Sequence, residues 1–211
     1  MFRSVCCMSS KPTPKKVFSV FKRHYKNVPL EVFGSSAYKT LVSTLLSSRT
    51  KDEITLIASK RLFKLAPNVE RLKNIKTKKL EGLIYPVGFY KTKAKQLKKL
   101  SLLVLINYKG KIPKKRDELM KLPGVGRKTA NLVLNRAFGI PAIAVDTHVH
   151  KISNLLGWVK TKTPEKTEEE LMRILPKKYW SNINRLFVSI GRQHTTKKNL
   201  VEFLQNEKLL N

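Results

Sequence analysis

The chain has 211 residues, of which 41% are hydrophobic. It is long enough for one domain or two small ones with a real core, which excludes a wholly disordered protein. Lys and Arg number 44 against 14 Asp and Glu, so the formal net charge at pH 7 is +30. An excess of this size indicates a polyanionic partner, most commonly nucleic acid, although charge alone leaves a ribosomal or membrane-surface role open.

The two cysteines, Cys6 and Cys7, are adjacent and lie near the N-terminus. Adjacent cysteines rarely bridge each other, and zinc or iron–sulfur centres need about three or four ligands. We therefore expect an intracellular chain without a structural metal. The longest apolar run, residues 102–106, is too short to cross a bilayer, so no membrane partner is expected. The first acidic residue is Glu31, and the opening stretch is expected to be a basic arm leading into a helix.

Helical periodicity runs through almost the whole chain. Apolar residues repeat at i, i+3, i+4 and i+7 within residues 38–46, and comparable buried faces are predicted within residues 97–108 and 183–190. The sequence Thr-Lys-Asp-Glu at residues 50–53 is typical of a capping box that opens a helix. These patterns predict an all-α fold with roughly ten helices.

The second half of the chain adds one more helix start and one exception to the helical pattern. Thr163 followed by Pro164 predicts an N-cap with proline in the first helical position. Residues 141–145 are the one strand-like piece, and they are too few to build a sheet. The all-α expectation therefore stands for this half as well.

The stretch that carries most functional information, residues 122–130, reads Leu-Pro-Gly-Val-Gly-Arg-Lys-Thr-Ala. A short helix is expected before it, over residues 117–121, and a longer one after it, over residues 127–137. Proline ends the first helix, and the glycines allow a tight turn that a partner can approach closely. Backbone N–H groups at the start of the second helix form an anion site, which can bind a DNA phosphate without reading sequence.

This arrangement is a helix-hairpin-helix motif. DNA contacts are expected from its turn and from the start of its second helix, at Leu122, Gly124, Val125, Gly126 and Arg127. The alternative is a corner between two helices that binds no ligand. The two glycines together with the basic pair Arg127 and Lys128 favour the DNA-binding interpretation.

Eighteen residues after Lys128, the sequence reads Ala-Val-Asp-Thr-His at residues 144–148. Asp146 follows a short apolar piece and precedes another helical face, so it is expected to be an N-cap. Capping is compatible with a second role for the same carboxylate.

The hairpin sequence followed by Ala-Val-Asp-Thr-His resembles the endonuclease III family of helix-hairpin-helix DNA glycosylases. The resemblance extends over about residues 38–192, and segments 45–52 and 87–94 also resemble family segments. It implies that Lys128 is the catalytic lysine and Asp146 the catalytic aspartate, facing each other at a DNA-binding cleft between two helical lobes. The adenine-excising branch typically lacks this lysine, so the resemblance favours a combined glycosylase and abasic-site lyase acting on oxidised pyrimidines.

Three further residues are assigned to DNA contact by the same resemblance. Phe89 is expected to be an apolar wedge, with a core aromatic as the alternative, and Lys93 a phosphate contact, with a solvated lysine as the alternative. Arg49 stands where well-known bacterial members carry Gln, which leaves the base preference open. His148 and His150 point to different sides of a helix and lack a third ligand, so a structural His148 near Asp146 is favoured over a metal site.

Many family members end with four cysteines that hold a [4Fe–4S] cluster. Here residues 191–198 read Gly-Arg-Gln-His-Thr-Thr-Lys-Lys, with Thr195 at the position of the first ligand. We therefore expect no cofactor, and we expect packing by the C-terminal tail and the N-terminal helix to take over the structural role of the cluster.

Three regions are predicted. Residues 1–29 form a basic arm and a helix that packs on the C-terminal lobe, residues 30–140 a lobe of about six helices that contains the hairpin at 117–137, and residues 141–211 the C-terminal lobe. The chain is expected to act as a monomer on damaged or abasic double-stranded DNA. Its compartment would be the nucleoid-containing cytoplasm of a prokaryote, or the nucleus or mitochondrion of a eukaryote. The alternatives are a mismatch-specific uracil or thymine glycosylase and a non-catalytic DNA-binding protein.

Overall fold

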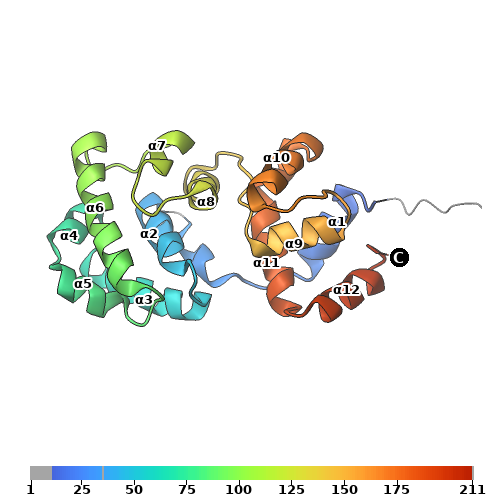
Figure 1. Cartoon of the computed structure of the whole chain (residues 1–211), viewed down its shortest axis with the longest axis horizontal. Coiled ribbons are helices and arrows are strands. Elements are labelled where there is room, and N and C mark those ends of the chain that lie inside the picture. Colours follow the sequence, from blue (N-terminus) through green and yellow to red (C-terminus); the bar gives the residue numbers. More distant parts are fainter. Residues whose placement is uncertain (1–10, 35, 211) are drawn as a thin grey trace, which may run out of the picture. The chain divides into compact units, whose positions relative to one another are not determined.

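The computed structural model describes residues 11–34 and 36–210, and most of the expected basic arm lies outside them. Within these ranges the chain folds into twelve α-helices and two short 3₁₀ helices without a β-strand (Figure 1), so the all-α prediction is confirmed. The chain divides into two compact units, with boundaries between Lys26 and Asn27 and between Ala144 and Val145. The expected boundaries, after residues 29 and 140, differ from these by a few residues.

The unit formed by residues 27–144 contains one 3₁₀ helix and seven α-helices. In chain order they are η1 (Pro29–Phe33), α2 (Ala37–Ser47), α3 (Asp52–Leu65), α4 (Val69–Asn74), α5 (Thr77–Ile84), α6 (Tyr90–Tyr108), α7 (Arg116–Met120) and α8 (Arg127–Phe138). Helix α2 is central, since it packs against η1, α3, α6 and α8. Its predicted apolar face, which includes Leu41, Val42 and Leu46, is fully buried.

The other unit combines α1 (Pro14–Arg23) with the C-terminal part of the chain. The latter comprises α9 (Thr147–Leu155), α10 (Pro164–Ile174), η2 (Lys177–Tyr179), α11 (Trp180–Gln193) and α12 (Lys197–Asn206). Helix α11 contacts both α1 and α9, and Phe187 on α11 packs against Phe18 and Phe21 of α1. Segments from the two ends of the chain therefore share one core.

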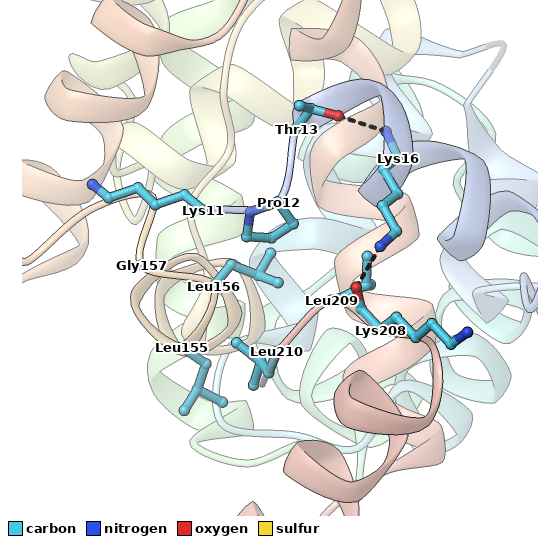
Figure 2. A pocket seen from close by; sticks show the side chains of 10 residues that line it. All are labelled: Lys11, Pro12, Thr13, Lys16, Leu155, Leu156, Gly157, Lys208, Leu209 and Leu210. Carbon is cyan, nitrogen blue, oxygen red and sulfur yellow. Dashed lines mark hydrogen bonds between the residues drawn. The ribbon is translucent and has the colours of Figure 1, made fainter. Parts of the chain in front are cut away.

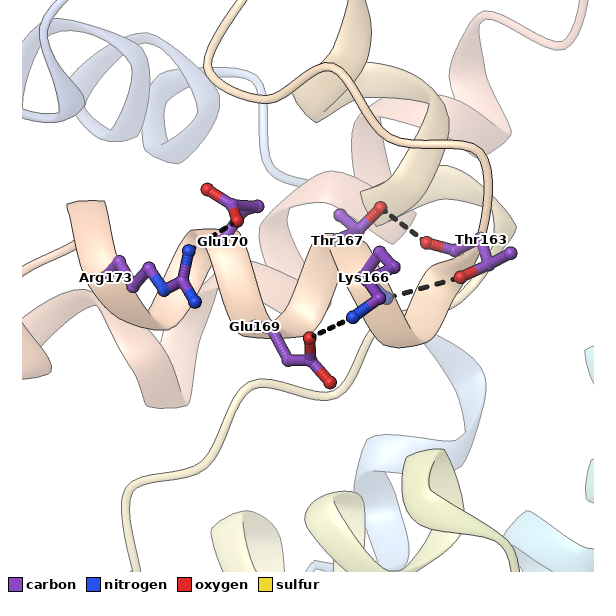
Figure 3. Close-up of polar contacts among 6 residues, drawn as sticks. All are labelled: Thr163, Lys166, Thr167, Glu169, Glu170 and Arg173. Carbon is purple, nitrogen blue, oxygen red and sulfur yellow. Dashed lines mark hydrogen bonds and ion pairs between the residues drawn. The ribbon is translucent and has the colours of Figure 1, made fainter.

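The start of α10 follows the sequence prediction. The Thr163 hydroxyl accepts a hydrogen bond from the Lys166 backbone N–H at 3.3 Å, and Pro164 opens the helix. Figure 3 shows this cap together with ion pairs along the exposed side of the helix, Lys166–Glu169 at 3.0 Å and Arg173–Glu170 at 2.9 Å. Exposed pairs of this kind contribute little to stability, so the cap and the buried face hold the helix.

The prediction of a capping box at residues 50–53 is wrong. Helix α3 begins at Asp52, and its N-cap residue Lys51 makes no side-chain capping bond. The Thr50 hydroxyl is used elsewhere, because it accepts a hydrogen bond from the backbone N–H of Gly88 at 3.0 Å. A local capping pattern cannot predict this contact, because Thr50 and Gly88 are 38 residues apart in the sequence.

Candidate active site

The turn between α7 and α8 is anchored by two buried side chains, those of Leu122 and Val125. The Leu122 backbone N–H donates to Leu119 O and that of Val125 donates to Leu122 O, both at 3.1 Å. Gly124 has a φ of +80°, and a Cβ there would lie 2.9 Å from Gln96 Oε1. The turn therefore requires glycine at this position, and the side chains of Leu122 and Val125 face the core rather than a ligand.

The start of α8 matches the expected anion site. Its N-cap is Gly126, which is exposed, and no side chain caps the helix or places an acidic group in its first turn. The basic residues Arg127 and Lys128 occupy that turn instead. Helix-terminal N–H groups and two cations thus lie together, an arrangement that attracts a phosphate.

Lys128 is exposed on this first turn. Its ammonium makes no hydrogen bond or ion pair with any residue in the part of the chain that the structure describes. The amine is therefore accessible to a ligand.

Asp146 is the N-cap of α9, as predicted. Its Oδ1 accepts a hydrogen bond from the Val149 backbone N–H at 2.9 Å, and the residue is partly buried. Its second carboxylate oxygen has no hydrogen-bond partner among the described residues. Lys128 belongs to the unit of residues 27–144 and Asp146 to the other unit.

Two asparagines that the sequence reasoning missed hold the segment leading toward Asp146. Asn135 bonds both the N–H and the C=O of Ala142, at 2.9 and 2.5 Å, and Asn131 Nδ2 donates to Ile143 O at 2.8 Å. These bonds satisfy backbone groups of the strand-like piece, which has no regular secondary structure and pairs with no strand among the described residues. The available signal was two amides four residues apart on an otherwise apolar helix face.

Arg49 and Phe89, two of the residues expected at DNA, lie together. Both are exposed, and both have left-handed backbones, with φ of 53° and 57°. The Arg49 guanidinium carbon lies 5.5 Å from the centre of the Phe89 ring, in cation–π geometry. Phe89 is 61% exposed, so the alternative of a core aromatic is wrong.

Lys93 is only 5% exposed, although it is a lysine. Its Nζ donates to Leu46 O at 2.8 Å, to Ser48 O at 2.5 Å and to Thr50 Oγ1 at 3.4 Å. Burial lowers the pKa of Lys93 to about 8. The Lys93 ammonium is hydrogen-bonded to other groups of the protein. The structure therefore favours a structural role for Lys93 over both the expected phosphate contact and a solvated lysine.

Comparisons with known proteins decide the family. Residues 42–177 match the HhH-GPD superfamily of base excision DNA repair proteins. Endonuclease III of Thermotoga maritima is 45% identical over 179 residues, covering 85% of this chain and 81% of that protein. The chain belongs to the endonuclease III family of base-excision-repair DNA glycosylases and abasic-site lyases.

Other members show the same relationship. The mouse endonuclease III-like protein 1 is 45% identical over 159 residues, and the match spans about half of the mouse protein, 53% of its length. The solved structure of a trapped endonuclease III–DNA covalent intermediate is 33% identical, with a TM-score of 0.74 over 89% of this chain and 90% of that one. The fold and the family thus agree with the resemblance seen in the sequence.

The iron–sulfur cluster that many endonuclease III family members carry does not fit the residues present here. Helix α11 ends at Gln193 and is followed by His194, Thr195 and Thr196, and no cysteine occurs in residues 11–34 or 36–210. Those ranges also contain no group of three or more His, Cys, Asp or Glu side chains that could hold a metal ion.

The two histidines near Asp146 make protein contacts. His150 Nδ1 lies 2.6 Å from Thr167 Oγ1, and the ring of His148 packs against Gly191 of α11. This agrees with the structural role favoured for His148.

Among the described helices, none combines the length and apolarity needed to cross a membrane.

A pocket of about 590 Å³ lies in the unit that contains α1, and none of the predicted site residues lines it. Figure 2 shows the Lys16 ammonium donating to the backbone oxygen of Lys208 at its edge. The lining is a mixture of lysines and leucines from three segments: Lys11, Pro12, Thr13, Lys16, Leu155, Leu156, Gly157, Lys208, Leu209 and Leu210. These residues come from the N-terminal segment, the end of α9 and the C-terminal tail.

Proposed function

We propose that this chain is a bifunctional enzyme that removes oxidised pyrimidines from DNA and then cleaves the strand 3′ to the abasic site. The observation that carries the proposal is the exposed Lys128 on the first turn of α8, directly after the hairpin turn. A phosphate bound at that helix start would bring the neighbouring deoxyribose within reach of the lysine amine.

Lys128 supplies the nucleophile. Its neutral Nζ bonds to C1′ of the damaged nucleotide, while the glycosidic bond breaks and the base leaves with the electron pair and takes up a proton. Opening of the sugar at O4′ gives a C1′=N Schiff base, which acidifies the C2′ proton. Loss of that proton forms the C2′=C3′ double bond as the C3′–O bond breaks and the 3′ phosphate leaves. Water then hydrolyses the imine and frees the lysine.

Asp146 supplies negative charge. Breaking the glycosidic bond builds positive charge on the sugar, which a fixed carboxylate stabilises. Because Oδ1 caps α9, the carboxylate is held in place before substrate binds, and its second oxygen has no partner among the described residues. Asp146→Asn would keep the cap while removing the charge. The rate of base excision should therefore fall strongly, while the free energy of unfolding should change little.

The hairpin and the Arg49–Phe89 pair supply the DNA contacts. Backbone N–H groups near Gly124 and Gly126, with Arg127, bind phosphate without reading sequence. A damaged base must leave the helical stack before it can react, and Phe89 enters the gap while Arg49 bonds to the orphan base. The enzyme acts as a monomer, without an iron–sulfur cluster, in the compartment that holds the DNA.

Trapping with borohydride tests the proposal. Borohydride reduces the imine to an amine, so a duplex with an abasic site should become covalently attached to the wild-type chain. Lys128→Ala should abolish the adduct, whereas Lys121→Ala, a change at an exposed lysine at the end of α7, should leave it intact. Absence of an adduct with the wild type, or an undiminished adduct with Lys128→Ala, would overturn the proposal and favour a DNA-binding protein without catalysis.

A second candidate function is favoured by Arg49, which the family resemblance places where well-known bacterial members carry Gln. A guanidinium can form a bidentate pair with guanine, so the chain could act on uracil or thymine mispaired with guanine. A panel of duplexes with oxidised pyrimidines, uracil or thymine, each opposite guanine or adenine, separates the two. Faster excision of oxidised pyrimidines supports the first function, and faster excision of mispaired uracil or thymine supports the second.

A further inference from the structure

The C-terminal end of α2 is stabilised by a lysine from another helix. Helix α2 ends at Ser47, so the carbonyls of Leu46 and Ser48 lie at the negative end of the helix dipole. Lys93, on the first turn of α6, donates from its ammonium to both of these oxygens, at 2.8 and 2.5 Å. A buried ammonium thus fixes the point at which the Arg49 loop leaves α2.

Thr50 connects this loop to the turn before α6. Its hydroxyl accepts from the Gly88 backbone N–H at 3.0 Å and from the Lys93 ammonium at 3.4 Å. A Cβ on Gly88 would lie 2.6 Å from Arg49 O, so only glycine allows the two backbones this approach. The two loops are therefore held together by a network that converges on Lys93 and Thr50.

Arg49 and Phe89, the residues presented by these two loops, both have conformations that L side chains rarely adopt. Such conformations persist only where the surroundings enforce them, and they gather at ligand-binding positions. Phe89 also starts α6, and its carbonyl accepts from the Lys93 backbone N–H at 3.0 Å. Lys93 consequently contacts both loops, through its backbone and its ammonium.

We propose that Lys93 is a positioning residue, whose buried ammonium fixes the loops that present Arg49 and Phe89 to the gap in damaged DNA. The proposal rests on the assignment of Arg49 and Phe89 to that gap. Because the loops are ordered before DNA binds, the complex avoids the entropic cost of fixing them on binding. Lys93 itself makes no contact with DNA.

The test compares two binding constants. One is the Kd for a duplex with a stable abasic analogue, which has a gap and an orphan base, and the other is the Kd for the same duplex intact. Fluorescence anisotropy gives both, and neither requires catalysis. Lys93→Met keeps the apolar stem without the donors, and it should lower the preference for the gapped duplex by about tenfold. Lys99→Met, an exposed lysine on the same helix, makes the same charge change and should leave the preference unchanged.

A double-mutant cycle shows whether Lys93 acts through the pair. Arg49→Ala combined with Phe89→Ala should lower the preference as far as Lys93→Met does, and adding Lys93→Met should lower it no further. Additive losses, or an equal weakening of both Kd values, would instead indicate a direct phosphate contact and overturn the proposal. An unchanged preference in Lys93→Met would overturn it as well.

A milder pair of variants applies if Lys93→Met fails to fold. Thr50→Val removes the hydroxyl at nearly constant volume and should lower the preference, whereas Thr50→Ser keeps the hydroxyl and should not.

Borohydride trapping is independent of this comparison of Kd values. A wild type that prefers the gapped duplex but forms no adduct contradicts the proposed lyase only. A wild type that forms an adduct without any preference leaves the lyase standing and contradicts the assignment of Arg49 and Phe89 to the gap, and with it the role of Lys93.

Discussion

At the scale of single residues, Gly191 shows how a missing side chain lets two helices approach. It is buried on α11, and a Cβ there would lie 2.7 Å from His148 Cγ and 3.0 Å from His148 Cε1. His148 lies in the first turn of α9, where Asp146 is the cap, so a larger side chain at Gly191 would press on this turn. The packing of one glycine thus supports the placement of a proposed catalytic carboxylate.

Gly191→Ala is therefore expected to destabilise the fold by about 1–3 kcal/mol, the usual cost of overpacking a buried site. Urea unfolding measures this change. Gly82→Ala is the matched control, because Gly82 is exposed within α5 and a Cβ there meets nothing within 4 Å. This control should be neutral or stabilising by up to about 1 kcal/mol. Equal stability of Gly191→Ala and wild type would contradict the proposed contact.

The lowered pKa of Lys93 gives a second prediction, on the pH dependence of stability. Burial lowers this pKa from an ordinary value of 10.5 to about 8. Between these values the unfolded chain keeps the Lys93 proton and the folded chain releases it, so the contribution of Lys93 to stability rises with pH. The free energy of unfolding of wild type, relative to Lys93→Met, should therefore be greater near pH 10 than near pH 7. A difference that stays constant or falls would contradict the burial of the ammonium.

At the scale of elements, α12 is held by aromatic packing. Phe203 on α12 stacks on His194 with ring centres 4.4 Å apart, and it meets the rings of His24 and Phe21 edge-on or tilted. Burial, followed by the charges of His24 and Lys26, lowers the pKa of His194, which favours a neutral ring on Phe203. Glu207 adds ion pairs to Arg23 at 2.6 Å and to His24 at 2.8 Å. The C-terminal tail and the N-terminal helix are therefore joined by ring contacts and ion pairs.

Phe203→Ala should remove the centre of this cluster and destabilise the fold by about 2–4 kcal/mol, since Phe203 is only partly buried. Thermal and urea unfolding measure the loss. Lys198→Ala, an exposed change on the same helix, should alter stability by less than about 0.5 kcal/mol. If the two variants were equally stable, the packing of α12 on α1 would not stabilise this unit.

Much of this element level was predictable from the sequence, because helices carry local signals. The apolar face of α2, the Thr163 cap and the Asp146 cap follow from spacings of three or four residues. The roles of Thr50 and Lys93 were not predictable, since their partners include backbone groups about 40 residues away. A sequence pattern identifies a capping hydroxyl or a lysine, but tertiary structure decides which oxygen or N–H it meets.

At the scale of the whole molecule, the net charge of +30 is the excess of basic over acidic residues that no ion pair within the chain can neutralise. Only 14 acidic residues face 44 basic ones, and several of the acidic residues already pair with neighbours, as in Lys166–Glu169 and Arg173–Glu170. Most of the positive charge therefore remains available to a polyanion. Such a protein should bind any DNA duplex, and specificity must come from local contacts.

Binding to an intact duplex should consequently fall steeply with salt. If six to ten phosphates are contacted, the affinity should drop by about 10³- to 10⁵-fold between 50 and 200 mM salt, with a linear dependence of log K on log salt concentration. Arg127→Ala should reduce this slope by about one, because Arg127 lies at the start of α8, where a phosphate is expected to bind. Lys64→Ala, an exposed change on α3, lowers the net charge equally without touching the hairpin, so its slope should stay near that of the wild type. Equal slopes for Arg127→Ala and Lys64→Ala would show that the charge acts only as a diffuse field, and that the hairpin holds no particular phosphate.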